Sequence, residues 1–172
     1  MNPKLEALFD EPEKGYLQAD ELNALSQFVS SLPERISFYQ RLRNEEVTLM
    51  QSVADALQQQ FPQESEAKLK RSIQNGILMV RYAAMAMLTD DIDMVTKRLE
   101  SWLPEIVEAY DTKAIDIALY QLIKTQFAGR FSSTQMALLI PGLDAAERLI
   151  AGGQLTSESA EAITSESLVG LF

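Results

Sequence analysis

The stretch that decides the fold is LKRSIQNGILMVRYAAMAML, residues 69–88. Its apolar residues recur at the spacing of one helix face, and between Ile77 and Leu88 nearly every side of that helix is apolar. A helix that is apolar all round belongs in the interior of a protein. Residues 69–88 therefore predict a central, buried helix against which other helices pack.

Helical spacing continues on both sides of this segment, and the 172-residue chain has only 7 glycines and 6 prolines to interrupt it. Apolar residues predict a short helix within residues 1–14 and a longer helix from Ala19 to Leu32. Ser31 and Glu34 have the spacing of a capping box around Pro33, which predicts a bend and a second helix from there to Phe61. Further helices are expected near residues 92–106, 115–127, 136–140 and 143–150, with an interruption at Pro141.

These segments add up to about eight helices of unequal length, a pattern that favours a globin-like orthogonal bundle over an up-and-down bundle. The predicted fold class is thus all-α and globin-like, with an N-terminal helical hairpin over about residues 1–32. Residues 1–152 are expected to form one domain. Residues 153–172 are rich in Ser, Glu and Ala, and we expect an acidic tail there that is either helical or mobile.

The charge of the chain limits its partners. With 15 basic and 25 acidic residues, the formal net charge is −10, which disfavours nucleic acid and anionic lipid. No apolar run approaches the roughly 20 residues of a membrane span, and the N-terminus lacks the pattern of a signal peptide. We therefore expect a cytoplasmic protein without a membrane span.

Cysteine and histidine are both absent from the chain. Their absence excludes disulfides, thiolate chemistry, a proximal haem histidine and the usual transition-metal sites. Asp90, Asp91 and Asp93 stand at an expected helix start, where the helix dipole favours carboxylates, so we assign them to capping and expect no metal. No pair of acids stands out for general acid–base chemistry, and we expect no enzymatic activity and no cofactor.

Several short patterns occur in an order that resembles a known family. Glu21-Leu22 follows Tyr16-Leu17, Val80-Arg81-Tyr82 occurs in the central helix, Asp91 follows that helix, and Glu108-Ala109-Tyr110 comes later. In this order, over about residues 15–128, the chain resembles the phycobiliproteins, the allophycocyanin-like proteins of the phycobilisome. The resemblance implies a globin-like fold, a cyanobacterial light-harvesting antenna and assembly through other protein subunits.

The chain departs from the phycobiliproteins where those proteins attach their linear tetrapyrrole. The family has a cysteine there, followed closely by Arg-Asp, whereas this chain has Ser72, Gln74 and Asn75. A serine hydroxyl cannot form the thioether, and the two amides lack the charge with which the family's arginine and aspartate hold the pigment. We interpret Ser72, Gln74, Asn75 and the nearby Arg81 as vestigial chromophore-site positions.

Two residue groups near these positions have an ordinary structural explanation. Lys68, Lys70 and Arg71 could meet the propionates of a bilin, but a short basic cluster at a helix start is more often a solvated face. Arg81 lies in an otherwise apolar stretch, so we expect a carboxylate or a backbone carbonyl as its partner.

The favoured function is a non-catalytic, chromophore-less interaction protein that serves the antenna as an accessory, assembly or turnover factor. By resemblance, the partner is a second copy or a phycobiliprotein-type subunit, which places the protein at the cytoplasmic face of thylakoid membranes. The resemblance puts the partner interface at Tyr16, Leu17, Leu22, Leu25 and Asp91. The alternative is a sensor or carrier that holds a bilin or another hydrophobic ligand without a covalent bond. This alternative predicts an open pocket lined by Ser72, Gln74 and Asn75.

Overall fold

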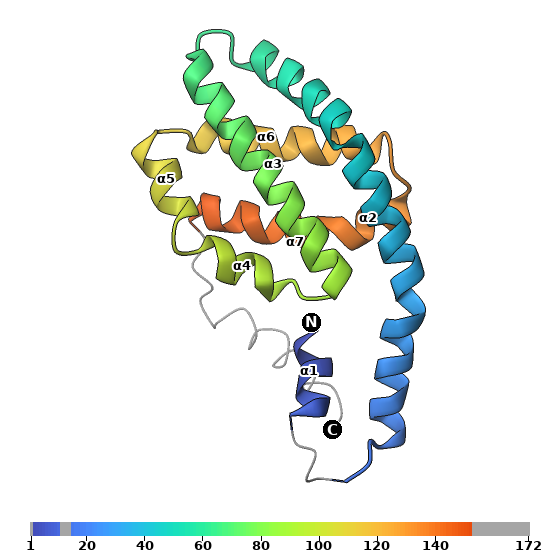
Figure 1. Cartoon of the computed structure of the whole chain (residues 1–172). Coiled ribbons are helices and arrows are strands. Elements are labelled where there is room, and N and C mark those ends of the chain that lie inside the picture. The colour runs from blue at the N-terminus through green and yellow to red at the C-terminus, as the bar shows by residue number, and fades with distance from the viewer. Residues whose placement is uncertain (1, 11–14, 153–172) are drawn as a thin grey trace, which may run out of the picture.

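The structure is a computed structural model that describes residues 2–10 and 15–152. All regular secondary structure within these ranges is helical, which confirms the predicted all-α class. Residues 153–172, for which the sequence predicts an acidic tail, lie outside the described residues. Figure 1 shows the helices in chain order, namely α1 (Pro3–Phe9), α2 (Ala19–Gln60), α3 (Glu66–Thr89), α4 (Asp93–Leu99), α5 (Leu103–Ala109), α6 (Lys113–Ala128) and α7 (Ser133–Ala151).

Helix α3 lies at the centre, as residues 69–88 predict. It packs against α2, α4, α6 and α7, and Figure 1 shows it crossing α6 and α7. One apolar cluster joins α2, α3, α6 and α7 and contains Phe38 and Phe127. A second cluster joins α3 to α4, α5 and α7 and contains Met79, Leu99 and Leu103. In the described part of the chain, no helix is long and apolar enough to cross a membrane.

The predicted bend and helix restart at Pro33 is wrong, because α2 runs without interruption from Ala19 to Gln60. Pro33 is exposed, so water can solvate the carbonyl that loses its helical partner. Ser31 does not cap a new helix; its hydroxyl donates to the Phe28 carbonyl at 2.8 Å and accepts from Arg35 Nε at 3.0 Å. The buried Phe38 holds the next turn in the core, so tertiary contacts carry the helix past the proline.

The interruption predicted at Pro141 is also wrong, since α7 continues through it to Ala151. The helix is held by burial on both sides of the proline, at Leu139 and Leu143. Gly142 does not end the helix but lets it approach α3. A Cβ atom at position 142 would lie 2.9 Å from the Cα and Cβ atoms of Ala83.

Candidate functional site

Helix α3 places the three residues that the sequence predicts to be vestigial attachment positions in different environments. Ser72 is completely buried, with 0% of its surface exposed. Gln74 is exposed and lines a groove of about 520 Å³ between the end of α2 and the start of α3, a groove that neither Ser72 nor Asn75 lines. Asn75 is partly buried, and its Nδ2 atom makes no hydrogen bond to the part of the chain that the structure describes. None of the grooves described between residues 2–10 and 15–152 is lined by more than one of these three side chains.

The buried Ser72 belongs to a small polar cluster with α6. Thr112 and Asp116 are each only 1% exposed, and the Thr112 hydroxyl lies 2.6 Å from Asp116 Oδ2 in a hydrogen bond. Burial raises the pKa of the Asp116 carboxyl above its ordinary value, while the hydroxyls of Thr112 and Ser72 act in the opposite direction. Ser72 lies near enough to affect this pKa, but within the described residues neither its Oγ atom nor Asp116 Oδ1 makes a hydrogen bond of regular geometry.

Tyr120, one turn further along α6, is also buried, and its hydroxyl makes no hydrogen bond in the described structure. Burial raises the pKa of this phenol, and the negative charges of Asp116 and Glu147 add to the effect. Together with Ser72 and Thr112, these side chains place polar atoms inside the core. Such atoms can bind one another or enclosed water, but a large ligand has no access to a fully buried side chain.

The turn after α5 closes over the start of α3. Lys68 Nζ lies 3.3 Å from both the Asp111 carbonyl oxygen and its Oδ2 atom. The Arg71 guanidinium lies 3.4 Å from the centre of the Tyr110 ring, a cation–π contact. Lys68 and Arg71 are therefore engaged within the chain, whereas Lys70 is exposed and lines the groove that Gln74 also lines.

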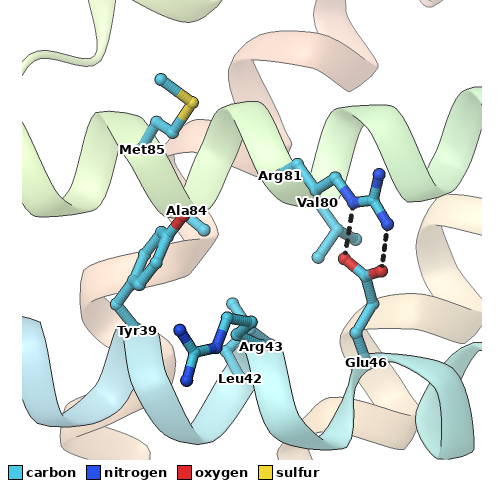
Figure 2. A pocket seen from close by; sticks show the side chains of 8 residues that line it. All are labelled: Tyr39, Leu42, Arg43, Glu46, Val80, Arg81, Ala84 and Met85. Carbon is cyan, nitrogen blue, oxygen red and sulfur yellow. Dashed lines mark hydrogen bonds and ion pairs between the residues drawn. The ribbon is translucent and has the colours of Figure 1, made fainter.

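Arg81 faces solvent rather than the core, contrary to what its apolar neighbours suggest. Its side chain is 62% exposed, and it makes two hydrogen bonds with the Glu46 carboxylate, at 2.9 and 2.6 Å. The expected carboxylate partner is thus confirmed, and hydrogen bonding to Glu46 raises the pKa of the guanidinium. Arg81 and Glu46 line a groove of about 360 Å³ between α2 and α3, and Tyr39 and Met85 line it too. Figure 2 shows these side chains.

Four of the five residues assigned to the partner interface lie on an N-terminal arm, which we define as α1, residues 15–18 and the first four turns of α2. Tyr16 is 98% exposed and Leu22 is 51% exposed, whereas Leu17 and Leu25 are partly buried. Leu5 of α1 is buried, and with Ala24 and Phe28 of α2 it lines a groove between the two helices. The arm therefore has its own apolar contacts and still leaves apolar side chains exposed.

The fifth residue, Asp91, lies in the turn between α3 and α4, where its Oδ1 atom accepts a hydrogen bond from the Met94 N–H at 3.2 Å. Its neighbour Asp90 joins this turn to the arm. Asp90 Oδ1 lies 2.8 Å from Arg35 Nη2, and Asp90 Oδ2 accepts from Asn2 Nδ2 at 2.7 Å. The same arginine also donates to the Met87 carbonyl at the end of α3. Sequence reasoning missed these contacts. Asp90 ends α3 in the left-handed backbone conformation, which aspartate adopts more readily than most residues.

Comparison with known families identifies the chain. A model of the phycobilisome protein family matches residues 10–150. The chain belongs to this family. The globin-like class expected from the sequence is thereby confirmed for the phycobilisome protein described here. No curated protein matches the chain.

The residues of this phycobilisome protein do not fit a covalently held bilin. The chain has no thiol, Ser72, which the sequence predicts to be the former attachment position, is buried against α6, and Gln74 lines a groove that Ser72 does not line. Among residues 2–10 and 15–152, no group of acidic side chains is arranged to hold a metal ion either.

Sequence reasoning also missed Asp116, the buried carboxylate nearest to Ser72. A signal was present, because Asp116 interrupts the buried apolar face formed by Ile115, Leu119 and Ile123. Its partner Thr112 comes four residues earlier, which is one helical turn and within hydrogen-bonding reach. The proximity of Asp116 to Ser72 depends on how α3 packs on α6 and has no local sequence signature.

Proposed function

We propose that this phycobilisome protein is a non-catalytic, chromophore-less interaction protein that serves the cyanobacterial light-harvesting antenna as an accessory, assembly or turnover factor. The observation that carries the proposal is the complete burial of Ser72, the residue that the sequence predicts in place of the family's attachment cysteine. This chain keeps the helices of the family, but its predicted attachment position is closed. One property of the family needs no pigment, and that property is contact with other subunits. We place this activity in the cytoplasm, with a protein partner mediating any association with thylakoid membranes.

The N-terminal arm is the surface that we propose for this contact. It carries exposed apolar side chains at Phe9, Tyr16 and Leu22, and a protein partner gains free energy by covering such groups. Arg35 and Asp90 anchor the arm on the end of α3, beside Asp91. An anchored arm loses less conformational entropy on binding than a free one, which favours association.

The polar groups in the core give no support for catalysis. Asp116 has the raised pKa that a general acid requires, but it is 1% exposed and a substrate cannot reach it. The carboxylates of Glu46 and Asp90 are already bound by arginines. We therefore propose a protein whose activity consists of binding.

Binding to isolated phycobiliprotein subunits tests the proposal. We expect the purified full-length chain to bind them in surface plasmon resonance, and we expect Tyr16→Ala to weaken that binding by about tenfold, the cost of truncating one anchor residue. Tyr110→Ala is the matched control, because it removes a 44% exposed tyrosine that lies after α5 and outside the arm. Equal loss with both variants, or no binding by the unaltered chain, would contradict the proposal.

A second measurement separates the proposal from the sensor or carrier alternative. The purified chain is titrated with phycocyanobilin while its absorption spectrum is recorded. We expect no stoichiometric, red-shifted band, because Ser72 is completely buried and the groove that Gln74 lines includes neither Ser72 nor Asn75. A saturable band at one bilin per chain would favour the carrier and would refute the chromophore-less assignment.

A further inference from the structure

The groove between the middle of α2 and the second half of α3, which we call the α2–α3 groove, lies apart from the predicted pigment position. Ser72, Gln74 and Asn75 do not line it. Its volume of about 360 Å³ falls within the range of small-molecule sites, roughly 300–1,000 Å³. The residues that line it are Tyr39, Leu42, Arg43, Glu46, Val80, Arg81, Ala84 and Met85.

Apolar side chains form the floor and one end of the α2–α3 groove. Leu42, Val80 and Ala84 are only 2%, 1% and 5% exposed, so they form a closed aliphatic floor. Figure 2 shows the Tyr39 ring reaching from α2 towards Ala84, and the exposed Met85 also lines the groove. An aromatic ring and a thioether are surfaces against which the apolar part of a small molecule packs well.

The charges in the α2–α3 groove are not balanced. Arg81 is held by Glu46 through two hydrogen bonds, which Figure 2 shows bridging the two helices. Arg43 is exposed, and its guanidinium reaches only Oδ1 of its neighbour Asn44, in two hydrogen bonds of 3.4 Å. No carboxylate of residues 2–10 and 15–152 forms an ion pair with Arg43. The groove therefore has one uncompensated positive charge in a chain whose net charge is −10.

Three other grooves of the described chain lack this excess of positive charge. The groove that Gln74 lines has three acidic residues against Lys70. The groove between α5 and the end of α7 has two acidic residues against Lys113. In the groove between α1 and α2, Arg35 is paired with Asp90. An anion is therefore attracted to the α2–α3 groove and not to these three.

We propose that the α2–α3 groove binds a small amphipathic carboxylate, a molecule with an apolar body and a single carboxylate. A carboxylate matches the planar guanidinium of Arg43, which can donate two parallel hydrogen bonds to it. One negative charge balances the excess of the groove, whereas a phosphate monoester would bring nearly two. The proposal concerns a small molecule and a surface outside the N-terminal arm, so it does not depend on the interaction role.

The arrangement of the groove assigns a part to each end. Arg43 binds the carboxylate, and the apolar body lies on the floor beside Tyr39. Glu46 lies three residues after Arg43 on the same helix, where two side chains are neighbours. Its carboxylate holds Arg81 and repels a bound anion, so it limits the affinity.

Titration of the full-length, 15N-labelled chain with sodium octanoate tests the site by nuclear magnetic resonance. We expect saturable shifts of the Val80 and Ala84 amide signals, with one site and a Kd of about 1 mM or lower. Octanamide has the same shape without the charge, and we expect it to bind at least about tenfold more weakly. Absence of saturable shifts, shifts centred on Gln74, or equal binding of octanamide would overturn the proposal.

Three variants test the assigned residues. Arg43→Gln should weaken octanoate binding about tenfold, because it removes a charge-assisted hydrogen bond. Arg98→Gln is the matched control; it removes the same charge from an exposed position on α4 that lines none of the grooves compared above. Glu46→Gln should strengthen binding about threefold or more, since it removes the repelling carboxylate. Equal losses with both arginine variants, or no gain with Glu46→Gln, would refute the assignment, and the amide spectra check that each variant keeps its fold.

The same spectra distinguish two other occupants. Poly-glutamate that shifts the groove signals when octanoate does not would assign the groove to an acidic protein segment. Groove signals that shift with protein concentration alone, without any octanoate binding, would assign it to a second copy of the chain. Either result would overturn the small-molecule site.

Discussion

A cysteine placed at position 72 should be unreachable in the folded protein. By its resemblance to the family, the sequence predicts the pigment position at Ser72. This residue is the seventh of α3, lies beside Asp116 of α6 and is 0% exposed. We expect the thiol of a Ser72→Cys variant to react with a reagent such as a maleimide only when α3 moves away from α6. Gln74→Cys is the matched control, because the side chain at 74 is exposed two residues further along the same helix.

The size of the difference follows from the free energy of local opening. Opening free energies range from near zero in frayed segments up to the global unfolding value, commonly 5–15 kcal/mol. Ser72 lies about two turns inside a central helix, so we take about 4 kcal/mol for its exposure. At 1.4 kcal/mol per factor of ten, the thiol at 72 should react about 1,000 times more slowly than the thiol at 74.

The assay compares labelling rates of the two variants in native buffer and in concentrated urea. Each variant has a single thiol because the chain contains no cysteine. In urea the two rates should agree, which corrects for intrinsic reactivity. Native rates within about tenfold of each other would correspond to an opening cost of only about 1.4 kcal/mol. That result would refute the argument that packing closes the attachment position, and adding a cysteine could then suffice for pigment attachment.

Two further predictions concern the packing of α3. Burial raises the pKa of Asp116 above its ordinary value of 3.8, so the folded state binds more protons than the unfolded state. The free energy of unfolding should therefore fall as pH rises from about 4 through the raised pKa. Urea titrations over pH should show that Asp116→Asn flattens this fall, and an unchanged slope would contradict it. Gly142→Ala should lower the free energy of unfolding by about 1–3 kcal/mol, because the added methyl group meets the backbone of Ala83. Gly76→Ala should change the free energy of unfolding by less than about 1 kcal/mol. The added Cβ would lie 2.7 Å from the end of the Leu119 side chain, which can move, and alanine favours the helix. Equal losses for the two variants in thermal melts would refute this contrast.

The sequence predicts helix identity well and helix continuity poorly. The apolar period of residues 69–88 is enough to predict the central helix, because its burial follows from its own composition. Pro33 and Pro141 mislead, since their local preference is to interrupt a helix. In the folded chain, burial of Phe38 beyond one proline, and of Leu139 and Leu143 around the other, outweighs that preference.

The candidate site divides in the same way between sequence and structure. The replacement of the attachment cysteine by Ser72 can be read from the sequence alone, and it excludes a thioether because a hydroxyl lacks the chemistry. Whether Ser72, Gln74 and Asn75 still line a pocket depends on the packing of α2 and α6 on α3, which sequence spacing does not encode.

By itself, the sequence determines what this phycobilisome protein is made of and which chemistry it lacks. It establishes a helical chain with a central apolar helix, a net charge of −10, and neither cysteine nor histidine. Only the tertiary structure decides that Ser72 faces α6, that Arg35 ties the arm to Asp90, and that Gln74 lines a groove apart from Ser72. The physical reason is that composition and period are local properties, whereas exposure depends on which distant helices come to lie against a given face.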